Sequence, residues 1–176
     1  LKGEYNIIPF DSLAGSVGGA FMCRTAYKMS KAGKSVEEIV KHLEVMREKT
    51  QVLLTLDNLE FSKRSGRVGT LKAALASVLN VKPIIRLQDG VLDMVERART
   101  RKAALTRVVE MGKEAVGDSP VVIGAVHAHD MESAKMLLEE AKKNLNVKES
   151  EFAELSISLA INLGPGTVGL VIYPAE

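Results

Sequence analysis

The feature that most constrains the fold of this chain is a β-hairpin signal in residues 81–98. The runs VKPIIRL and VLDMVERA flank the pair Asp89-Gly90. This pair is typical of the two-residue type I′ turn, in which both central residues have a positive φ. Because a hairpin joins antiparallel strands, at least one antiparallel pair is expected, and a purely parallel, doubly wound sheet is disfavoured.

Helix and strand signals alternate along the rest of the chain. Gly33 is typical of a helix C-terminus, and Ser35 and Glu38 have the spacing of a capping box that begins another helix. The predicted strands are 5–10, 51–56, 120–128, 152–161 and 168–174, and the predicted helices are 16–32, 35–49, a short helix after Asp57 that stops near Gly66, 70–79, 101–116 and 131–145. This order predicts an α/β fold with α+β character in the main domain, in which helices flank a mixed, largely antiparallel sheet.

Composition limits the classes of protein to which the chain can belong. The 176 residues are 46% hydrophobic, enough for one ordinary core or for one domain and part of another. With a net charge of +2, neither nucleic acid nor a membrane surface is an expected partner. A single cysteine, Cys23, excludes an intrachain disulfide. We expect a cytoplasmic protein, because the start of the chain lacks the pattern of a signal peptide and no apolar run reaches the roughly 18 residues of a membrane span.

A candidate anion site lies in the segment DSLAGSVGG, residues 11–19. A helix is predicted to begin here, and the first turn of a helix carries free backbone N–H groups and the positive end of the helix dipole. Ser16 is placed either to cap this helix or to donate its hydroxyl to an anion. Gly15, Gly18 and Gly19 would let a ligand approach the backbone closely. The alternative is an ordinary helix start with small residues for close packing.

A second candidate is the segment from Asn162 to Gly166, which we place between the last two predicted strands. Gly164 and Gly166 are further candidates for close approach of a ligand, although Gly-Pro-Gly also serves well as a simple turn.

Basic residues form a third candidate, a surface for an acidic partner or a phosphorylated ligand. They are Lys63, Arg64, Arg67, Arg86, Arg97, Arg99, Arg101 and Lys102. A set of solvated helix and strand faces is the default explanation for them. His127 and His129 are predicted on one face of a strand, but no third metal ligand is identifiable. We therefore expect strand-end histidines, with Asp130 as a helix cap, and assign neither a metal site nor a catalytic residue.

Several segments, taken together, resemble the DegV family. They are DSLAGSVG followed by a helix, GKSVEEIV, TLDNLEFSKRSGRV, LNVKPIIRLQDGVLDMVERARTRKAAL and the closing GPG, and they cover essentially the whole chain. The resemblance implies a two-domain bacterial protein that buries a long-chain fatty acid and needs no cofactor. It also implies a partner, a separate fatty-acid kinase that phosphorylates the bound carboxylate. Ser16 falls on the serine that binds this carboxylate, and Arg64, Arg67, Arg99 and Arg101 are candidates for docking the kinase.

Two departures from the family pattern affect this expectation. The N-terminal domain of the family precedes the Asp-Ser motif, so residues 1–34 are interpreted as its remnant and residues 35–176 as the C-terminal domain of a fragment or truncated member. Members also commonly have His-x-Gly-Pro-Gly at the last turn, where this chain has Asn162. Asparagine can donate a hydrogen bond to a carboxylate but cannot carry a charge.

Two other function classes stay open. The first is an acyl- or phosphoryl-transfer enzyme with Ser16 as its nucleophile, although the chain lacks a Gly-x-Ser-x-Gly motif and a clear base. The second is a protein-interaction module that uses the basic surface.

Overall fold

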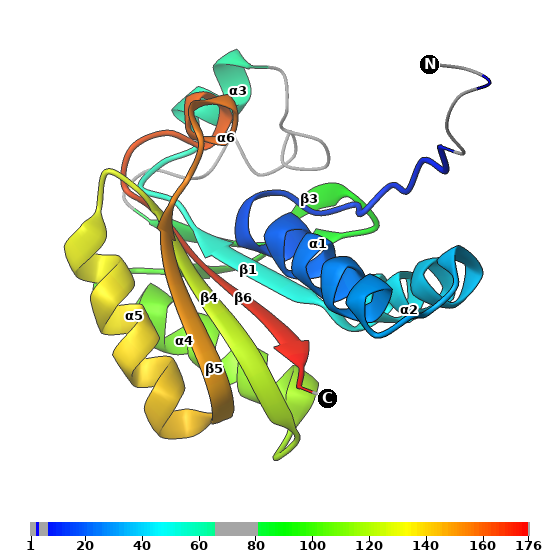
Figure 1. Cartoon of the computed structure of the whole chain (residues 1–176). Coiled ribbons are helices and arrows are strands. Elements are labelled where there is room, and N and C mark those ends of the chain that lie inside the picture. Colours follow the sequence, from blue (N-terminus) through cyan, green and yellow to red (C-terminus); the bar gives the residue numbers. More distant parts are fainter. Residues whose placement is uncertain (1–2, 4–6, 66–80, 176) are drawn as a thin grey trace.

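The computed structural model describes residue 3 and residues 7–65 and 81–175, and it forms one six-stranded sheet with helices on both faces (Figure 1). The helices are α1 (Ser16–Lys31), α2 (Val36–Lys49), α3 (Glu60–Arg64), α4 (Arg101–Val116), α5 (Met131–Asn144) and α6 (Ile157–Leu163). The strands are β1 (Gln51–Thr55), β2 (Lys82–Gln88), β3 (Val91–Ala98), β4 (Pro120–Ala128), β5 (Asn146–Glu154) and β6 (Thr167–Pro174).

The order of strands across the sheet is β3-β2-β1-β6-β4-β5. Of these neighbours, β4 and β5 are parallel and all other pairs are antiparallel. Asp89 and Gly90 have φ values of 51° and 76°, as the predicted type I′ turn between β2 and β3 requires. The mixed, largely antiparallel sheet and the hairpin are therefore confirmed.

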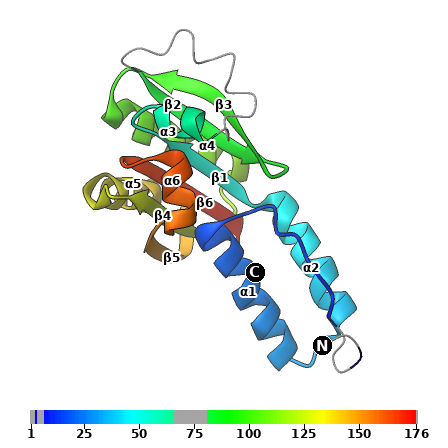
Figure 2. The same ribbon diagram turned by 90° about the horizontal axis from the view of Figure 1, so that it is seen from above.

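Each face of the sheet carries its own hydrophobic core. Helices α4 and α5 cover one face, with Val108 and Leu137 packed against strand residues such as Ile123. Helices α1 and α2 cover part of the other face, where Phe21 and Leu43 contribute to a second core. Figure 2 shows α3 and α6 side by side at one end of the strands, and the second core extends to them.

The predicted helix signals are confirmed at both ends of the α1–α2 turn. Gly33, after α1, has a φ of 78°. The hydroxyl of Ser35 accepts from the N–H of Glu38, whose side chain accepts from the N–H of Ser35, so the capping box is complete.

Helix α1 lies close to β4 because β4 has a glycine at the contact. A Cβ added at Gly124 would lie 2.4 Å from Cγ1 of Val17. Helix α1 thus packs on the sheet that strands β1 to β6 form. The division into a remnant, 1–34, and a second domain stays a prediction.

Two predicted elements differ in the structure. Residues 7–10, the described part of the predicted strand 5–10, form no strand, because no neighbouring strand pairs with them, and Ile7 is 66% exposed. The predicted strand 152–161 is the end of β5 followed by helix α6. Strand β5 begins at Asn146, before the predicted start at residue 152. Its polar first part was not predicted because this strand lies at the edge of the sheet and carries no apolar run. The predicted helix 70–79 lies outside the described residues.

The α6 segment was predicted as a strand because, over a short run, its apolar residues fit the spacing of a strand as well as that of a helix. Leu159 and Leu163 are four residues apart and turn toward the core, whereas Ile157 and Ile161 are 85% and 66% exposed. Gly164-Pro165-Gly166 consequently joins α6 to β6. It does not join two neighbouring strands as predicted, because β6 pairs with β1 and β4.

Candidate functional site

An apolar pocket of about 710 Å³ opens between the segment before α1, helix α6 and the β2–β3 hairpin. Its lining consists of Asp11, Leu13, Ala14, Gly15, Ser16, Val52, Leu54, Leu87, Gly90, Val91, Leu92, Val126, Leu155, Leu159, Asn162, Leu163 and Val171. We call this the acyl pocket. Aliphatic side chains dominate, and a few polar groups meet them, as in most small-molecule sites.

Ser16 begins α1 at the wall of the acyl pocket. Its φ of 52° lies in the left-handed region, and the preceding residue, Gly15, is extended with a φ of −118°. No side chain caps this helix start, and the Ser16 hydroxyl has no hydrogen-bond partner among the described residues. The first-turn N–H groups and this hydroxyl are therefore available to an anion.

Asn162 reaches the same pocket from α6. Its side-chain Nδ2 donates to the backbone carbonyl oxygen of Ser158 over 2.7 Å. Its backbone carbonyl oxygen accepts from the hydroxyl of Ser62 over 2.9 Å. The structure thus places the two predicted carboxylate contacts, Ser16 and Asn162, on one pocket. Asn162 lies on a helix rather than at a strand end, so the amide is held by its own helix.

The five candidate glycines occupy different surroundings. Gly15 lines the acyl pocket, where an added Cβ would lie 3.2 Å from Cδ1 of Leu159. Gly18 and Gly19 face the neighbouring Ala14. At Gly164 an added Cβ would lie 2.5 Å from the Phe61 ring, and at Gly166 it would lie 3.0 Å from Cβ of Asp57. Protein side chains occupy the space beside Gly164 and Gly166, and of the five candidates Gly15 is the one that lines the acyl pocket.

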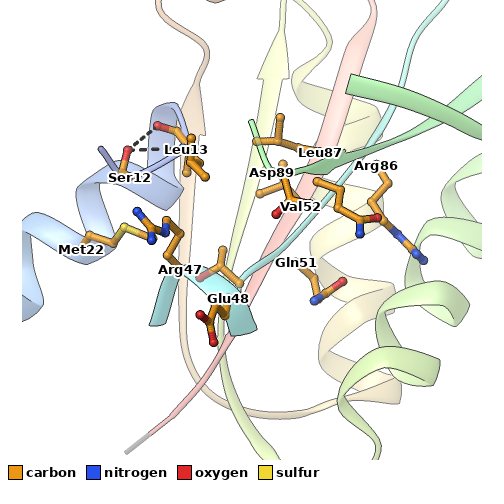
Figure 3. Close-up of a pocket in the computed structure, with 13 residues that line it drawn as sticks. Ser12, Leu13, Met22, Arg47, Glu48, Gln51, Val52, Arg86, Leu87 and Asp89 are labelled. Carbon is orange, nitrogen blue, oxygen red and sulfur yellow. Dashed lines mark hydrogen bonds between the residues drawn. The ribbon is translucent and has the colours of Figure 1, made fainter. Parts of the chain in front are cut away.

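A second pocket of about 450 Å³, missed by the sequence analysis, adjoins the first (Figure 3). We call it the polar pocket, because six of its residues are charged or carry amides: Arg47, Glu48, Gln51, Arg86, Gln88 and Asp89. Other residues that line it include Ser12, Met22 and Thr50. Its residues come from α1, α2, β1, β2, the hairpin turn and the segment before α1, so no local sequence signal brings them together.

The predicted docking arginines have different partners. Arg64 forms an ion pair with Glu60 one helical turn away, and Arg99 is exposed. Arg101 is largely enclosed: its Nη2 lies 2.7 Å from Oδ2 of Asp130 and 2.6 Å from the carbonyl oxygen of Gly166. Arg67 lies outside the described residues. Of the three that the structure describes, Arg64 and Arg99 offer the exposed charge that a docking surface needs.

Asp130 is the N-cap of α5, as predicted, and accepts from the N–H of Ser133 over 3.1 Å. Burial raises the pKa of this carboxyl. The hydrogen bonds from Ser133 and Arg101, together with the charge of Arg101, outweigh burial and leave the pKa of Asp130 below its ordinary value.

The two candidate histidines have different surroundings. His127 is buried in β4 and packs against the ring of Phe152, with 5.2 Å between the ring centroids. His129 follows the end of β4 with a φ of 54°, so it does not continue the face of the strand as predicted. In the described part of the chain no group of three or more His, Cys, Asp or Glu side chains could hold a metal ion.

Comparison with known proteins agrees with this architecture. A family model described as "Uncharacterised protein, DegV family" matches residues 2–175. This chain belongs to the DegV family. A DegV domain-containing protein of Clostridium perfringens is 29% identical over 97% of this chain and 61% of its own length. The chain therefore spans about three-fifths of such a DegV relative.

Solved DegV structures share the fold closely. A fatty-acid-binding DegV family protein from Thermus thermophilus superposes with a TM-score of 0.90 at 30% identity, over 94% of this chain and 60% of that one. DegV of Bacillus subtilis, described as a fatty acid binding protein, gives a TM-score of 0.82 at 30% identity, over 96% of this chain and 60% of that one. Among the described residues of this DegV chain, no helix is both long enough and apolar enough to span a bilayer.

Proposed function

We propose that this DegV chain binds a long-chain fatty acid in the acyl pocket, with the carboxylate at Ser16 and Asn162. The observation that carries the proposal is the pocket itself: aliphatic walls meet an uncapped helix start and one amide. The solved relatives described as binding fatty acids support it. Burial of each methylene contributes about 0.8 kcal/mol, so the alkyl chain supplies most of the affinity and the polar groups orient it.

The same pocket favours a carrier over an enzyme with Ser16 as nucleophile. Such an enzyme needs a base within hydrogen-bond reach of the serine. Among the described residues that line the acyl pocket, Asp11 is the only one with an ionisable side chain, and its carboxylate accepts from the N–H of Leu13 over 3.0 Å. Ser16 is thus suited to hold an anion.

We further propose that the carrier presents the bound carboxylate to a partner fatty-acid kinase, in the cytoplasm. The family resemblance motivates this step, and the exposed Arg64 and Arg99 are the candidate contacts for an acidic partner. In this role the chain binds and positions the ligand, and the partner supplies the chemistry.

The fatty acid is tested by extraction and mass spectrometry of purified protein after exposure to excess oleate or palmitate. We expect a bound long-chain acid, and recovery of no lipid would refute the proposal.

The carboxylate contact is tested with Ser16→Ala, which should weaken fatty-acid binding by about 0.5–2 kcal/mol, the scale of one hydrogen bond at a helix start. Ser30→Ala, at the exposed far end of the same helix, is the matched control and should bind as the parent does. Equal affinities for the parent and Ser16→Ala would mean that Ser16 does not contact the carboxylate.

A further inference from the structure

We infer that Leu13 is a partition that sets the length of the acyl chain that the pocket accepts; the inference rests on the proposed fatty-acid function. The acyl pocket and the polar pocket are neighbours that share four lining residues: Leu13, Ala14, Val52 and Leu87. Figure 3 shows Leu13 on the segment before α1, across the polar pocket from Val52 and Leu87 of the sheet. A side chain in this position separates the two spaces.

Leu13 closes this boundary by packing on the hairpin turn. Its Cδ2 lies 3.1 Å from the point where a Cβ at Gly90 would stand, so the absence of a side chain at Gly90 makes room for it. Two residues later, Gly15 lies against Leu159 of α6. The segment from Leu13 to Gly15 therefore crosses the open face of the sheet from the hairpin to α6.

The backbone of Leu13 is held in a conformation that leucine rarely adopts. Its φ is 49°, in the left-handed region. Hydrogen bonds from both sides hold the segment. The Leu13 N–H donates to Oδ1 of Asp11 over 3.0 Å, and Arg47 Nη1 donates to the carbonyl of Asp11 over 2.8 Å. The Ser12 hydroxyl donates to the carbonyl of Ala14 over 2.9 Å and accepts from the Ala14 N–H over 3.3 Å. A strained residue held in this way at a pocket boundary points to a functional position.

The placement of the polar groups orients the ligand. Ser16 and Asn162 lie on the side of the acyl pocket formed by α6 and β4, whereas Leu13 lies on the side formed by β2 and the hairpin. Ser16 follows Leu13 by three residues, so their Cα atoms lie at most about 11 Å apart. A fatty acid with its carboxylate at Ser16 therefore bends within the acyl pocket before its methyl end meets Leu13.

The chemistry beyond Leu13 explains why a partition matters. A methylene buried in the acyl pocket improves the dissociation constant by about fourfold. A methylene that passes Leu13 enters a space lined by Arg47, Glu48 and Gln51, whose charges and amides lose water without gaining a partner. The gain in affinity with chain length should therefore stop where the methyl end meets Leu13.

The test measures dissociation constants for saturated fatty acids of about 12 to 20 carbons with parent and variant proteins. For the parent we expect affinity to rise with length and then level off. Leu13→Ala should move the levelling point at least two carbons longer, and Leu13→Phe should move it shorter. Leu159→Ala, which removes the same atoms from a residue that lines the acyl pocket alone, should weaken binding at every length without moving that point.

The outcomes separate the inference from the proposed function. An unchanged levelling point in Leu13→Ala and Leu13→Phe, or an equal shift in Leu159→Ala, would overturn the role of Leu13 and leave fatty-acid binding intact. Absence of binding by the parent at every chain length would overturn the proposed function and the inference with it.

Discussion

Replacing Arg101 by alanine should destabilise the fold, because this arginine joins three segments that are distant in sequence. From the first residue of α4, it bonds to Asp130, the cap of α5, and to the carbonyl of Gly166, ahead of β6. Hydrogen bonds to charged groups contribute about 1.5–3 kcal/mol each when enclosed. The side chains of Arg101 and Asp130 are 21% and 25% exposed, so water partly replaces the lost bonds. We therefore expect a loss of roughly 2–3 kcal/mol.

Urea unfolding followed by circular dichroism measures this difference, and the melting temperature should fall by about 5–10 °C for a domain of this size. Arg99→Ala is the matched control, because Arg99 is exposed two residues earlier, and its effect should stay within about 0.5 kcal/mol. Equal stabilities of the two variants would refute a bridging role for Arg101. A double-mutant cycle with Asp130→Asn should give a coupling energy of at least about 1 kcal/mol.

The pH dependence of the stability difference between the parent and Arg101→Ala gives an independent check. The pKa of Asp130 is lowered in the folded state, so its contribution is fully present above the unfolded value of about 3.9 and is lost as the pH falls through the folded pKa. The stability gap between parent and Arg101→Ala should therefore narrow below about pH 4. A residual gap should persist, because the bond from Arg101 to the Gly166 carbonyl does not titrate. A gap that stays constant from neutral to acidic pH would mean that Asp130 does not take part.

Three further predictions concern the pocket, the docking surface and the core. Asn162→His should strengthen fatty-acid binding most at mildly acidic pH, where the imidazolium forms, and parallel affinity profiles from about pH 5.5 to 8 would place residue 162 outside the reach of the carboxylate. Charge reversal at Arg64 and Arg99 should slow association with an acidic partner kinase and reduce its salt dependence in stopped-flow measurements, whereas unchanged rates at low salt would leave these residues as solvated charges. Gly124→Ala should cost about 1–3 kcal/mol in thermal or urea unfolding, because the new methyl would overlap Val17, and a neutral effect would show that α1 moves away freely.

Local chemistry made much of the fold predictable. The type I′ turn at Asp89-Gly90, the capping box at Ser35 and Glu38, and the cap at Asp130 each depend on groups within three residues of one another. These signals determine where an element begins or turns whatever surrounds it. For the same reason the free helix start at Ser16 was recognisable as an anion-binding candidate before its pocket was known.

Only the tertiary structure decided the order of the strands and the composition of the pocket. Strand β6 lies between β1 and β4, and edge strand β5 was missed in part because its exposed residues carry no apolar pattern. The alternation of Ile157, Leu159 and Ile161 resembled a strand, but a helix satisfies its own backbone without a neighbouring strand. The position of Leu13 between two pockets depends on Gly90, far along the chain. These contacts join residues that are far apart in the sequence, and nothing in the local sequence shows that they meet.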